Sequence, residues 1–318
     1  MNVEKEKKTV AILGLGGVGG FLGARLLSAG QHSGLEIAFV ARGETYRALQ
    51  KTGLIFESEG TKTVVRPDRL IQSGTTTEAV DLVLLATKSN GLEAAVAENQ
   101  TLFSEKTLVI PLQNMVDAAS RIRPLVNGAA VIDACIYLVS NVEKPGQVRH
   151  LGGPGKIAAG FPTTERYAWV FSLLGKTGLE VSLCADIDVQ LWKKFLFISS
   201  LGAVTAAYGL TFGMLLQSQV HWALWEELMG ELLQLAQASG VSLSPAAIGE
   251  AQAVVRSFPA DSRSSFQRDV AQGNAGEKEV LVDEVIAKSR QKGLSPERYE
   301  SMEVLICENI QKNGKTTC

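Results

Sequence analysis

Residues 10–20 have the sequence VAILGLGGVGG, and this stretch determines the fold that we predict. Four apolar residues run directly into Gly14-x-Gly16-x-x-Gly19, and an apolar pattern of helical period follows at once. The order predicts a buried strand, a tight turn and the N-terminus of a helix. In such a loop Gly14 permits the turn, Gly16 lets a pyrophosphate approach the backbone, and Gly19 lets helix and strand pack closely.

A dinucleotide is the ligand that this loop favours, since the free N–H groups and partial positive charge of a helix N-terminus attract phosphate. The alternative is a glycine-rich turn that holds no ligand. The predicted cofactor-binding residues of the loop are Gly14, Gly16, Gly17, Val18 and Gly19.

The end of the second predicted strand, 36–41, indicates which dinucleotide is bound. A site for NAD usually carries an Asp or Glu at this point, to bind the ribose 2′-hydroxyl. Here the strand ends in Ala41-Arg42-Gly43, and the nearest acid, Glu44, lies past the turn. The planar, permanently charged guanidinium of Arg42 suits a 2′-phosphate, so we predict NADP(H). The alternative is that Arg42 is a solvated loop residue.

Size and composition exclude several classes of protein. The chain has 318 residues, a net charge of −2 and no run of basic residues, which argues against binding to nucleic acid. The first strand begins by residue 9 and leaves no room for a signal peptide, so we expect a cytoplasmic protein. We expect neither a metal site nor a disulfide framework, because histidine is scarce and the cysteines are far apart. The four cysteines are Cys135, Cys184, Cys307 and Cys318.

One uncharged segment, 195–220, is long enough to cross a bilayer. Serine, threonine and glycine residues dilute its apolar character, however, and a helix that is apolar on nearly all sides also suits the centre of a larger helical domain. We therefore predict a buried helix and no membrane partner.

The order of the predicted elements indicates an α/β fold with two domains. Residues 9–125 alternate apolar strands with helical patterns, which predicts a parallel sheet, and 53–66 resemble a short antiparallel excursion from it. Beyond Ile187 nearly every segment has a helical period, with Ser244-Pro245 and Ser295-Pro296 as expected N-cap and N1 pairs. We predict a Rossmann-type NADP-binding domain over 1–186 and an all-helical substrate domain over 187–318. A cleft between such domains is the usual place for a substrate.

Six motifs in a fixed order resemble those of the ketopantoate reductase (2-dehydropantoate 2-reductase) family along nearly the whole chain. They are the glycine-rich loop, Val40-Ala41-Arg42-Gly43, Thr87-Lys88, Leu112-Gln113-Asn114, Leu191-Trp192-x-Lys194-Phe195 and the stretch from Ser264-Ser265 to Glu277. The resemblance implies a Rossmann domain followed by a helical domain, and an oxidoreductase that reduces a 2-keto acid with NADPH on the route to pantothenate.

The resemblance also assigns roles to individual residues. Lys194 is implied to stabilise and protonate the keto oxygen as general acid, and Glu277 to contact the substrate hydroxyl and position the lysine. Ser265 is implied to bind the substrate carboxylate. Lys88 and Asn114 are implied to lie around the nicotinamide and its ribose, with Asn114 also near the substrate. Ordinary structural roles, such as helix ends, caps and turns, are the alternatives for all five.

The chain departs from the family pattern on its substrate side. Ile198 and Gly202, one and two helical turns after Lys194, stand where the family has asparagines, and Ser262 replaces a third. The pocket should therefore be more apolar, which favours a paralogue that acts on another oxoacid. A reductase of β-hydroxyacids or imines, and a catalytically silent NADP(H)-binding protein, are further alternatives. The sequence leaves open the physiological substrate, domain closure, formation of a homodimer and the role of Cys318.

Overall fold

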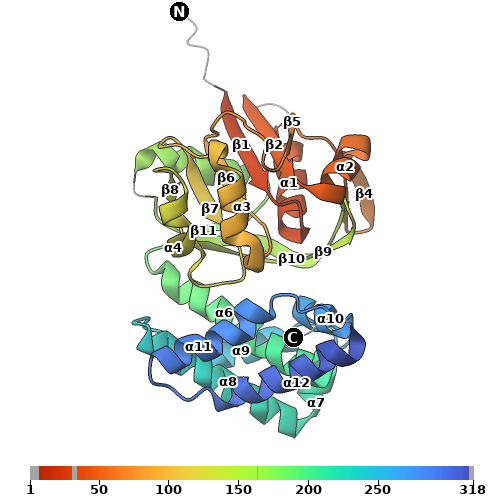
Figure 1. Ribbon diagram of the computed structural model, residues 1–318, viewed down its shortest axis with the longest axis vertical. Helices are drawn as coiled ribbons and strands as arrows, with labels where there is room; N and C mark the ends of the chain where they lie inside the picture. Colours follow the sequence, from red (N-terminus) through yellow and green to blue (C-terminus); the bar gives the residue numbers. More distant parts are fainter. Residues whose placement is uncertain (1–6, 31–33, 163, 315–318) are drawn as a thin grey trace, which may run out of the picture. The chain divides into compact units, whose positions relative to one another are not determined.

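The computed structural model describes residues 7–30, 34–162 and 164–314, and these form two compact units (Figure 1). The first unit contains the chain up to Gln113 together with Asp117–Ile187. The second contains the chain from Asp188 onward together with Asn114–Val116, a short loop segment that packs with the helical part. Cys318 and His32 lie outside the described residues.

The first unit is built on a parallel sheet of six strands, which confirms the predicted Rossmann-type architecture. Its spatial order is β5-β2-β1-β6-β7-β8, and every neighbouring pair is parallel. β1 is buried at its centre, with Val10, Ala11 and Ile12 fully shielded, as expected where helices cover both faces of a sheet. The strands are β1 (Lys8–Leu13), β2 (Leu35–Ala41), β5 (Arg69–Gln72), β6 (Leu82–Leu85), β7 (Leu108–Pro111) and β8 (Ala130–Val131).

Helices lie between the strands of the first unit in the chain order. They are α1 (Gly17–Gly30), α2 (Gly43–Thr52), η1 (Ser89–Gly91), α3 (Leu92–Glu98), η2 (Gln100–Leu102), α4 (Ala118–Ile122), η3 (Arg123–Leu125), η4 (Glu165–Tyr167) and α5 (Ala168–Lys176).

A second sheet contains the predicted antiparallel excursion, because β3 and β4 pair in antiparallel register from Leu54↔Val65 to Ser58↔Thr61. The long strand β10 continues this sheet, parallel to β3 and β11 and antiparallel to β9. The sequence analysis missed β5, which adds to the main sheet beside β2. The strands of the second sheet are β3 (Leu54–Ser58), β4 (Thr61–Val65), β9 (Ala134–Lys144), β10 (Gln147–Gly160) and β11 (Val181–Cys184).

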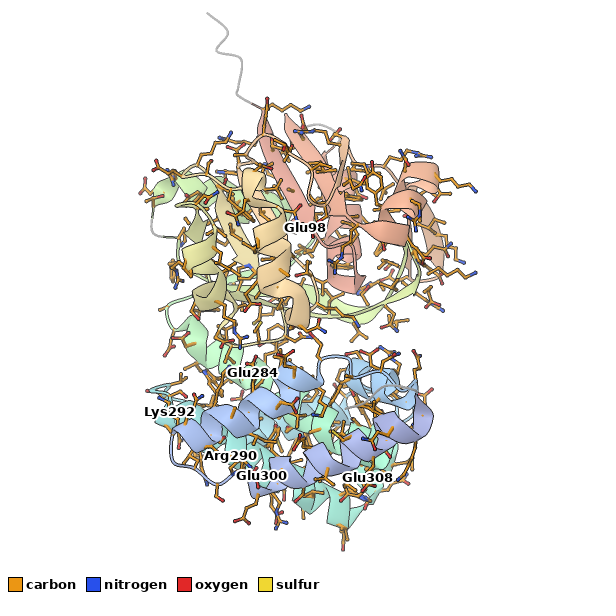
Figure 2. All side chains as sticks on the ribbon, viewed as in Figure 1. Glu98, Glu284, Arg290, Lys292, Glu300 and Glu308 are labelled. Carbon is orange, nitrogen blue, oxygen red and sulfur yellow. The ribbon has the colours of Figure 1, made fainter. Side chains whose placement is uncertain are left out.

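The second unit is helical, as predicted. The expected N-cap and N1 pairs are each displaced by one residue: Pro245 and Pro296 occupy the N-cap positions themselves. The elements are α6 (Ile187–Tyr208), α7 (Phe212–Gln217), α8 (Gln219–Ala238), α9 (Ala246–Arg256), α10 (Ser265–Ala271), the π-helical turn η5 (Glu279–Asp283), α11 (Glu284–Gln291) and α12 (Glu297–Asn313). An ion pair between Arg290 and Glu300 joins α11 to α12 (Figure 2).

The uncharged segment 195–220 forms most of α6, whose residues 199–207 are buried, together with α7 and the start of α8, where Met214 and Val220 are exposed. Ser199, Ser200 and Thr205 are fully buried within it, and each hydroxyl is hydrogen-bonded. Over the described part of the chain, no helix combines the length and the apolar character needed to span a membrane.

The cysteines differ in state. Cys135 and Cys184 take part in no disulfide, whereas Cys307 on α12 is disulfide-bonded. The widely spaced cysteines were expected to form no disulfide framework, and Cys307 is the one cysteine of the described residues that is in a disulfide.

Candidate active site

The glycine-rich loop joins β1 to α1 with the geometry that a dinucleotide requires. Gly14 has φ +97°, and a Cβ there would lie 2.7 Å from the backbone nitrogen of Thr87. A Cβ on Gly19 would overlap the carbonyl oxygen of Gly14, which explains the close approach of helix and strand. Nothing lies within 4 Å of a Cβ on Gly16, so the backbone is open at this point.

Helix α1 begins at Gly17, and the N–H groups of its first turn, including that of Val18, have no acceptor within the helix. Free donors and an open approach at Gly16 together fit a pyrophosphate. Gly17 has a packing role as well, because a Cβ there would overlap the carbonyl oxygen of Ser140 on β9.

Arg42 occupies the tip of the loop after β2, as the N-cap residue of α2. Its side chain is 77% exposed, and the nearest carboxylate is that of Glu98 on α3, at 3.8 Å (Figure 2). An exposed ion pair of this length contributes little stability, so the guanidinium can exchange that partner for a phosphate at low cost.

The ends of β6 and β7 bring Lys88, a predicted site residue, and Gln113, which precedes the predicted Asn114, to the same edge of the sheet. Lys88 follows β6 and is exposed, at the N-cap position of η1. Gln113 follows β7 and is buried, and its amide nitrogen donates to the carbonyl oxygens of Leu85 (3.1 Å) and Thr87 (3.3 Å). Gln113 thereby fixes the two strand ends to each other, directly before Asn114.

Three of the predicted residues meet in the second unit. The ammonium of Lys194 on α6 donates to Oδ1 of Asn114 at 3.0 Å, and Nδ2 of Asn114 donates to Oε2 of Glu277 at 3.2 Å. All three side chains are half-buried. A cation and an anion on opposite ends of one amide determine which way that amide points. We name this chain of hydrogen bonds the Lys194–Asn114–Glu277 relay.

The two positions that depart from the family pattern lie on the same helix as Lys194. Ile198 is half-buried and Gly202 is buried. A Cβ on Gly202 would lie 3.3 Å from Cδ1 of Phe266 and 3.9 Å from Cδ1 of Leu281. The surroundings of Gly202 are therefore apolar and closely packed.

Ser265 is exposed at the first position of α10. The cap of this helix is its neighbour Ser264, whose hydroxyl accepts from the backbone N–H of Gln267 at 3.1 Å. Ser265 takes no part in the two hydrogen bonds that define the relay.

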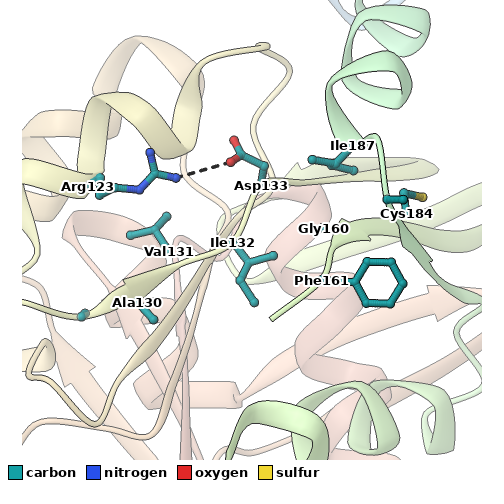
Figure 3. Close-up of a pocket in the computed structure, with 11 residues that line it drawn as sticks. Arg123, Ala130, Val131, Ile132, Asp133, Gly160, Phe161, Cys184 and Ile187 are labelled. Carbon is teal, nitrogen blue, oxygen red and sulfur yellow. Dashed lines mark hydrogen bonds and ion pairs between the residues drawn. The ribbon is translucent and has the colours of Figure 1, made fainter. Parts of the chain in front are cut away.

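A hollow of about 480 Å³ in the first unit lies elsewhere (Figure 3). The Arg123–Asp133 ion pair, at 3.5 Å, and the aromatic ring of Phe161 line it together with Cys184. None of the predicted cofactor or substrate residues does so. Across 7–30, 34–162 and 164–314, no cluster of three or more His, Cys, Asp or Glu side chains could hold a metal ion.

Sequence reasoning missed the linking role of Asn114, which it placed at the nicotinamide and the substrate. The motif Gln113-Asn114 after a buried strand was the available signal, because two adjacent amides at a strand end suggest a pair of hydrogen-bonding tasks.

Comparison with known proteins agrees with this architecture. The family model "Ketopantoate reductase PanE/ApbA" matches residues 10–163, and the model of its C-terminal domain matches residues 186–306. The 2-dehydropantoate 2-reductase of Mycobacterium tuberculosis is 28% identical over 287 residues, which are 90% of this chain and 92% of that protein.

Solved structures show the same fold. The crystal structure of a ketopantoate reductase from Ralstonia eutropha JMP134 has a TM-score of 0.86 at 25% identity, over 96% of this chain and 99% of that one. A D-mandelate dehydrogenase, solved with NADH and anilino(oxo)acetate, has a TM-score of 0.87 at 18% identity and covers the same shares. The chain belongs to the ketopantoate reductase family, a family of oxidoreductases.

Proposed function

We propose that the protein reduces a 2-keto acid with an apolar side chain to the 2-hydroxy acid, with NADPH as the reductant and Lys194 as the general acid. The Lys194–Asn114–Glu277 relay is the observation that carries this proposal. It presents one ammonium whose orientation is set by a neutral amide, and a carboxylate that favours the charged form of the lysine.

The cofactor would be held by the first unit. The open backbone at Gly16 and the free N–H groups of α1 would bind the pyrophosphate, and Lys88 would face the nicotinamide side of the same sheet edge. Bound NADPH supplies the hydride. Arg42 supports NADPH over NADH, since β2 ends without an acid and the guanidinium is exposed.

Lys194 would then act on the keto oxygen. Negative charge grows on this oxygen as the hydride arrives, and an ammonium can both stabilise that charge and donate the proton. Asn114 accepts one N–H of the ammonium and thereby orients it. Glu277 would accept a hydrogen bond from the product hydroxyl, and Ser265, if it reaches the substrate, would bind its carboxylate.

We assign the choice of substrate to the residues of α6 that follow Lys194 by one and two helical turns. Ile198 and Gly202 offer no hydrogen-bonding side chain where family members carry asparagines, and Phe266 packs beside Gly202. An apolar substituent therefore fits better there than a hydroxylated one. The D-mandelate dehydrogenase with the same fold was solved with anilino(oxo)acetate, an oxoacid that bears an aromatic ring.

The test is consumption of NADPH and of NADH with a panel of 2-keto acids. The panel includes ketopantoate, branched aliphatic 2-keto acids, phenylpyruvate and benzoylformate. We expect NADPH to be preferred, and branched or aromatic substrates to give higher kcat/KM than ketopantoate. Turnover of 3-hydroxy acids alone would instead favour a β-hydroxyacid dehydrogenase.

A second candidate is a protein that binds NADP(H) without catalysis, which the absence of the family asparagines at Ile198 and Gly202 favours. Calorimetric binding of NADPH together with no turnover on the whole panel would support it. The retained relay argues for the enzyme, because a silent binding protein has no need to orient an ammonium.

A further inference from the structure

A buried hydroxyl on α6 connects this helix to the π-helical turn that follows Glu277. Ser199 is fully buried, and its Oγ donates to the carbonyl oxygen of Leu281 at 2.7 Å. The hydroxyl of Tyr299 on α12, also fully buried, lies 2.7 Å from the same Oγ. A serine has one hydroxyl hydrogen, which Leu281 receives, so Tyr299 must be the donor to Ser199.

Leu281 carries this contact on to Glu277 through its backbone. Its carbonyl accepts from Ser199, and its N–H donates to the carbonyl oxygen of Glu277 at 2.9 Å. Leu281 lies at the middle of η5, a π-helical turn, and such turns are rare and frequent at functional sites. A hydroxyl at this carbonyl therefore stabilises the wider turn that directly follows Glu277.

These contacts close a ring with the relay. Lys194 bonds Asn114, Asn114 bonds Glu277, the backbone of Glu277 bonds Leu281, and Leu281 bonds Ser199, five residues after Lys194 on the same helix. The separation of the lysine and the glutamate is thus fixed from two sides. We propose that Ser199, oriented by Tyr299, is a positioning residue that sets Glu277 against Asn114 and Lys194.

Two features keep the donor in place. Burial raises the pKa of Tyr299 well above its ordinary value, so its hydroxyl stays protonated and able to donate. The carboxylate of Glu231 accepts the backbone N–H groups of Arg298 (2.8 Å) and Tyr299 (3.1 Å), which fixes the first turn of α12.

The neighbouring serine provides a matched control. Ser200 is equally buried, accepts a hydrogen bond from an aromatic donor, Nε1 of Trp225 (2.9 Å), and donates to a carbonyl, that of Leu196 (2.6 Å). That carbonyl belongs to α6 itself, so Ser200 takes no part in the ring. Ser199→Ala and Ser200→Ala therefore remove the same chemistry from adjacent positions.

The inference rests on the proposed function for its kinetic readout. Misplacement of Glu277 weakens the support for the ammonium form of Lys194, so the alkaline limb of the pH profile of kcat should move to lower pH. In Ser199→Ala we expect a shift of about half a pH unit and a loss of kcat of roughly 5- to 10-fold, with the KM for NADPH unchanged. Tyr299→Phe should give a smaller shift in the same direction. Ser200→Ala should not move the alkaline limb of the pH profile, even if its Tm falls as far as that of Ser199→Ala.

A second readout needs no substrate. The fraction of Lys194 acylated by acetic anhydride at a fixed alkaline pH, measured by mass spectrometry, should rise in Ser199→Ala and Tyr299→Phe but not in Ser200→Ala. If the wild-type protein reduces no 2-keto acid, the proposed function fails, and the labelling still decides the role of Ser199. The inference would be overturned if Lys194 were acylated to the same extent in Ser199→Ala and Ser200→Ala, or if no variant differed from the wild type. Either result would leave the proposed reductase activity untouched. Should Ser199→Ala not fold, Tyr299→Phe alone decides between these outcomes.

Discussion

The ammonium nitrogen of Lys194 lies 3.0 Å from Oδ1 of Asn114, although 80 residues separate the two in the sequence. The same amide donates to Glu277, a further 163 residues from Asn114 along the chain. Asn114 packs with the helical unit although it follows β7 of the sheet. A residue that follows a strand of the sheet in the sequence thus belongs with the charged side chains of the helical unit.

Replacing Lys194 by alanine tests the general acid directly. Loss of a proton donor of this kind reduces turnover by roughly 10²- to 10⁴-fold, so we expect kcat of Lys194→Ala to fall within that range in the assay with the best 2-keto acid. Lys193→Ala is the matched control, since Lys193 pairs with Glu250 at the surface and should keep its activity. Unchanged turnover in Lys194→Ala would remove this lysine from the mechanism.

Replacing Arg42 tests the proposed discrimination between the two nicotinamide dinucleotides. Arg42→Ala should weaken NADPH binding by about 10- to 100-fold, the effect of losing a hydrogen bond between charged groups, and should leave NADH binding nearly unchanged. Isothermal titration with both cofactors measures this. Arg47→Ala on the same helix, α2, serves as the control for a general loss of positive charge. An equal loss for both cofactors would mean that Arg42 does not contact the 2′-phosphate.

The sequence predicted the parallel sheet well, because Val10-Ala11-Ile12 and the glycines after it carry unambiguous local signals: a continuous apolar run, a required turn and a helix start. β5 escaped prediction for the opposite reason. Its four residues, Arg69–Gln72, begin and end with polar side chains, and only pairing with β2 makes them a strand.

The sequence suggested candidate members of the site but not how they are arranged. Lys194, Asn114 and Glu277 each stood in a family-like motif, yet no local pattern reports a contact between positions so far apart in the chain. The Ser199–Tyr299 contact left no sequence signal at all, since a serine in an apolar helix resembles any other small residue that dilutes hydrophobicity.

The open backbone at Gly16 gives a test of the cofactor loop that separates binding from folding. A methyl group at Gly16 meets nothing within 4 Å, so Gly16→Ala should keep the Tm of the wild type, while it obstructs the pyrophosphate and weakens NADPH binding by about 10- to 100-fold. Gly19→Ala is the contrasting variant, because its methyl group overlaps the carbonyl of Gly14 and should lower the Tm. Tight NADPH binding by Gly16→Ala would contradict the predicted site.

Ile198 and Gly202 test substrate choice, and the structure separates the two positions. Ile198→Asn places an amide at a half-buried position and should raise kcat/KM for ketopantoate relative to branched 2-keto acids. Gly202→Asn must displace Phe266, 3.3 Å from its Cβ, and should destabilise the fold by about 1–3 kcal/mol. Ile198→Asn alone is therefore the cleaner experiment. Urea unfolding shows whether the variant that combines Ile198→Asn with Gly202→Asn remains folded. No gain on ketopantoate would place the specificity elsewhere.

Glu231 should make the stability of the helical unit depend on pH. Burial raises the pKa of its carboxyl above the ordinary value of 4.5, although the N–H groups of Arg298 and Tyr299 partly oppose the shift. The folded state therefore binds this proton more tightly than the unfolded chain does. Its contribution to stability is complete below pH 4.5 and is lost as the pH rises through the raised pKa.

Glu231→Gln replaces the titrating carboxyl by an amide that does not titrate. The amide oxygen can still accept a hydrogen bond from a backbone N–H group of α12. As the pH rises from about 4 to about 7, the free energy of unfolding of the wild type should therefore fall relative to that of Glu231→Gln. Urea unfolding followed by circular dichroism at several pH values measures the difference. A difference that stays constant over this range would show that Glu231 titrates alike in the folded and unfolded chains, and that its two backbone contacts offset its burial.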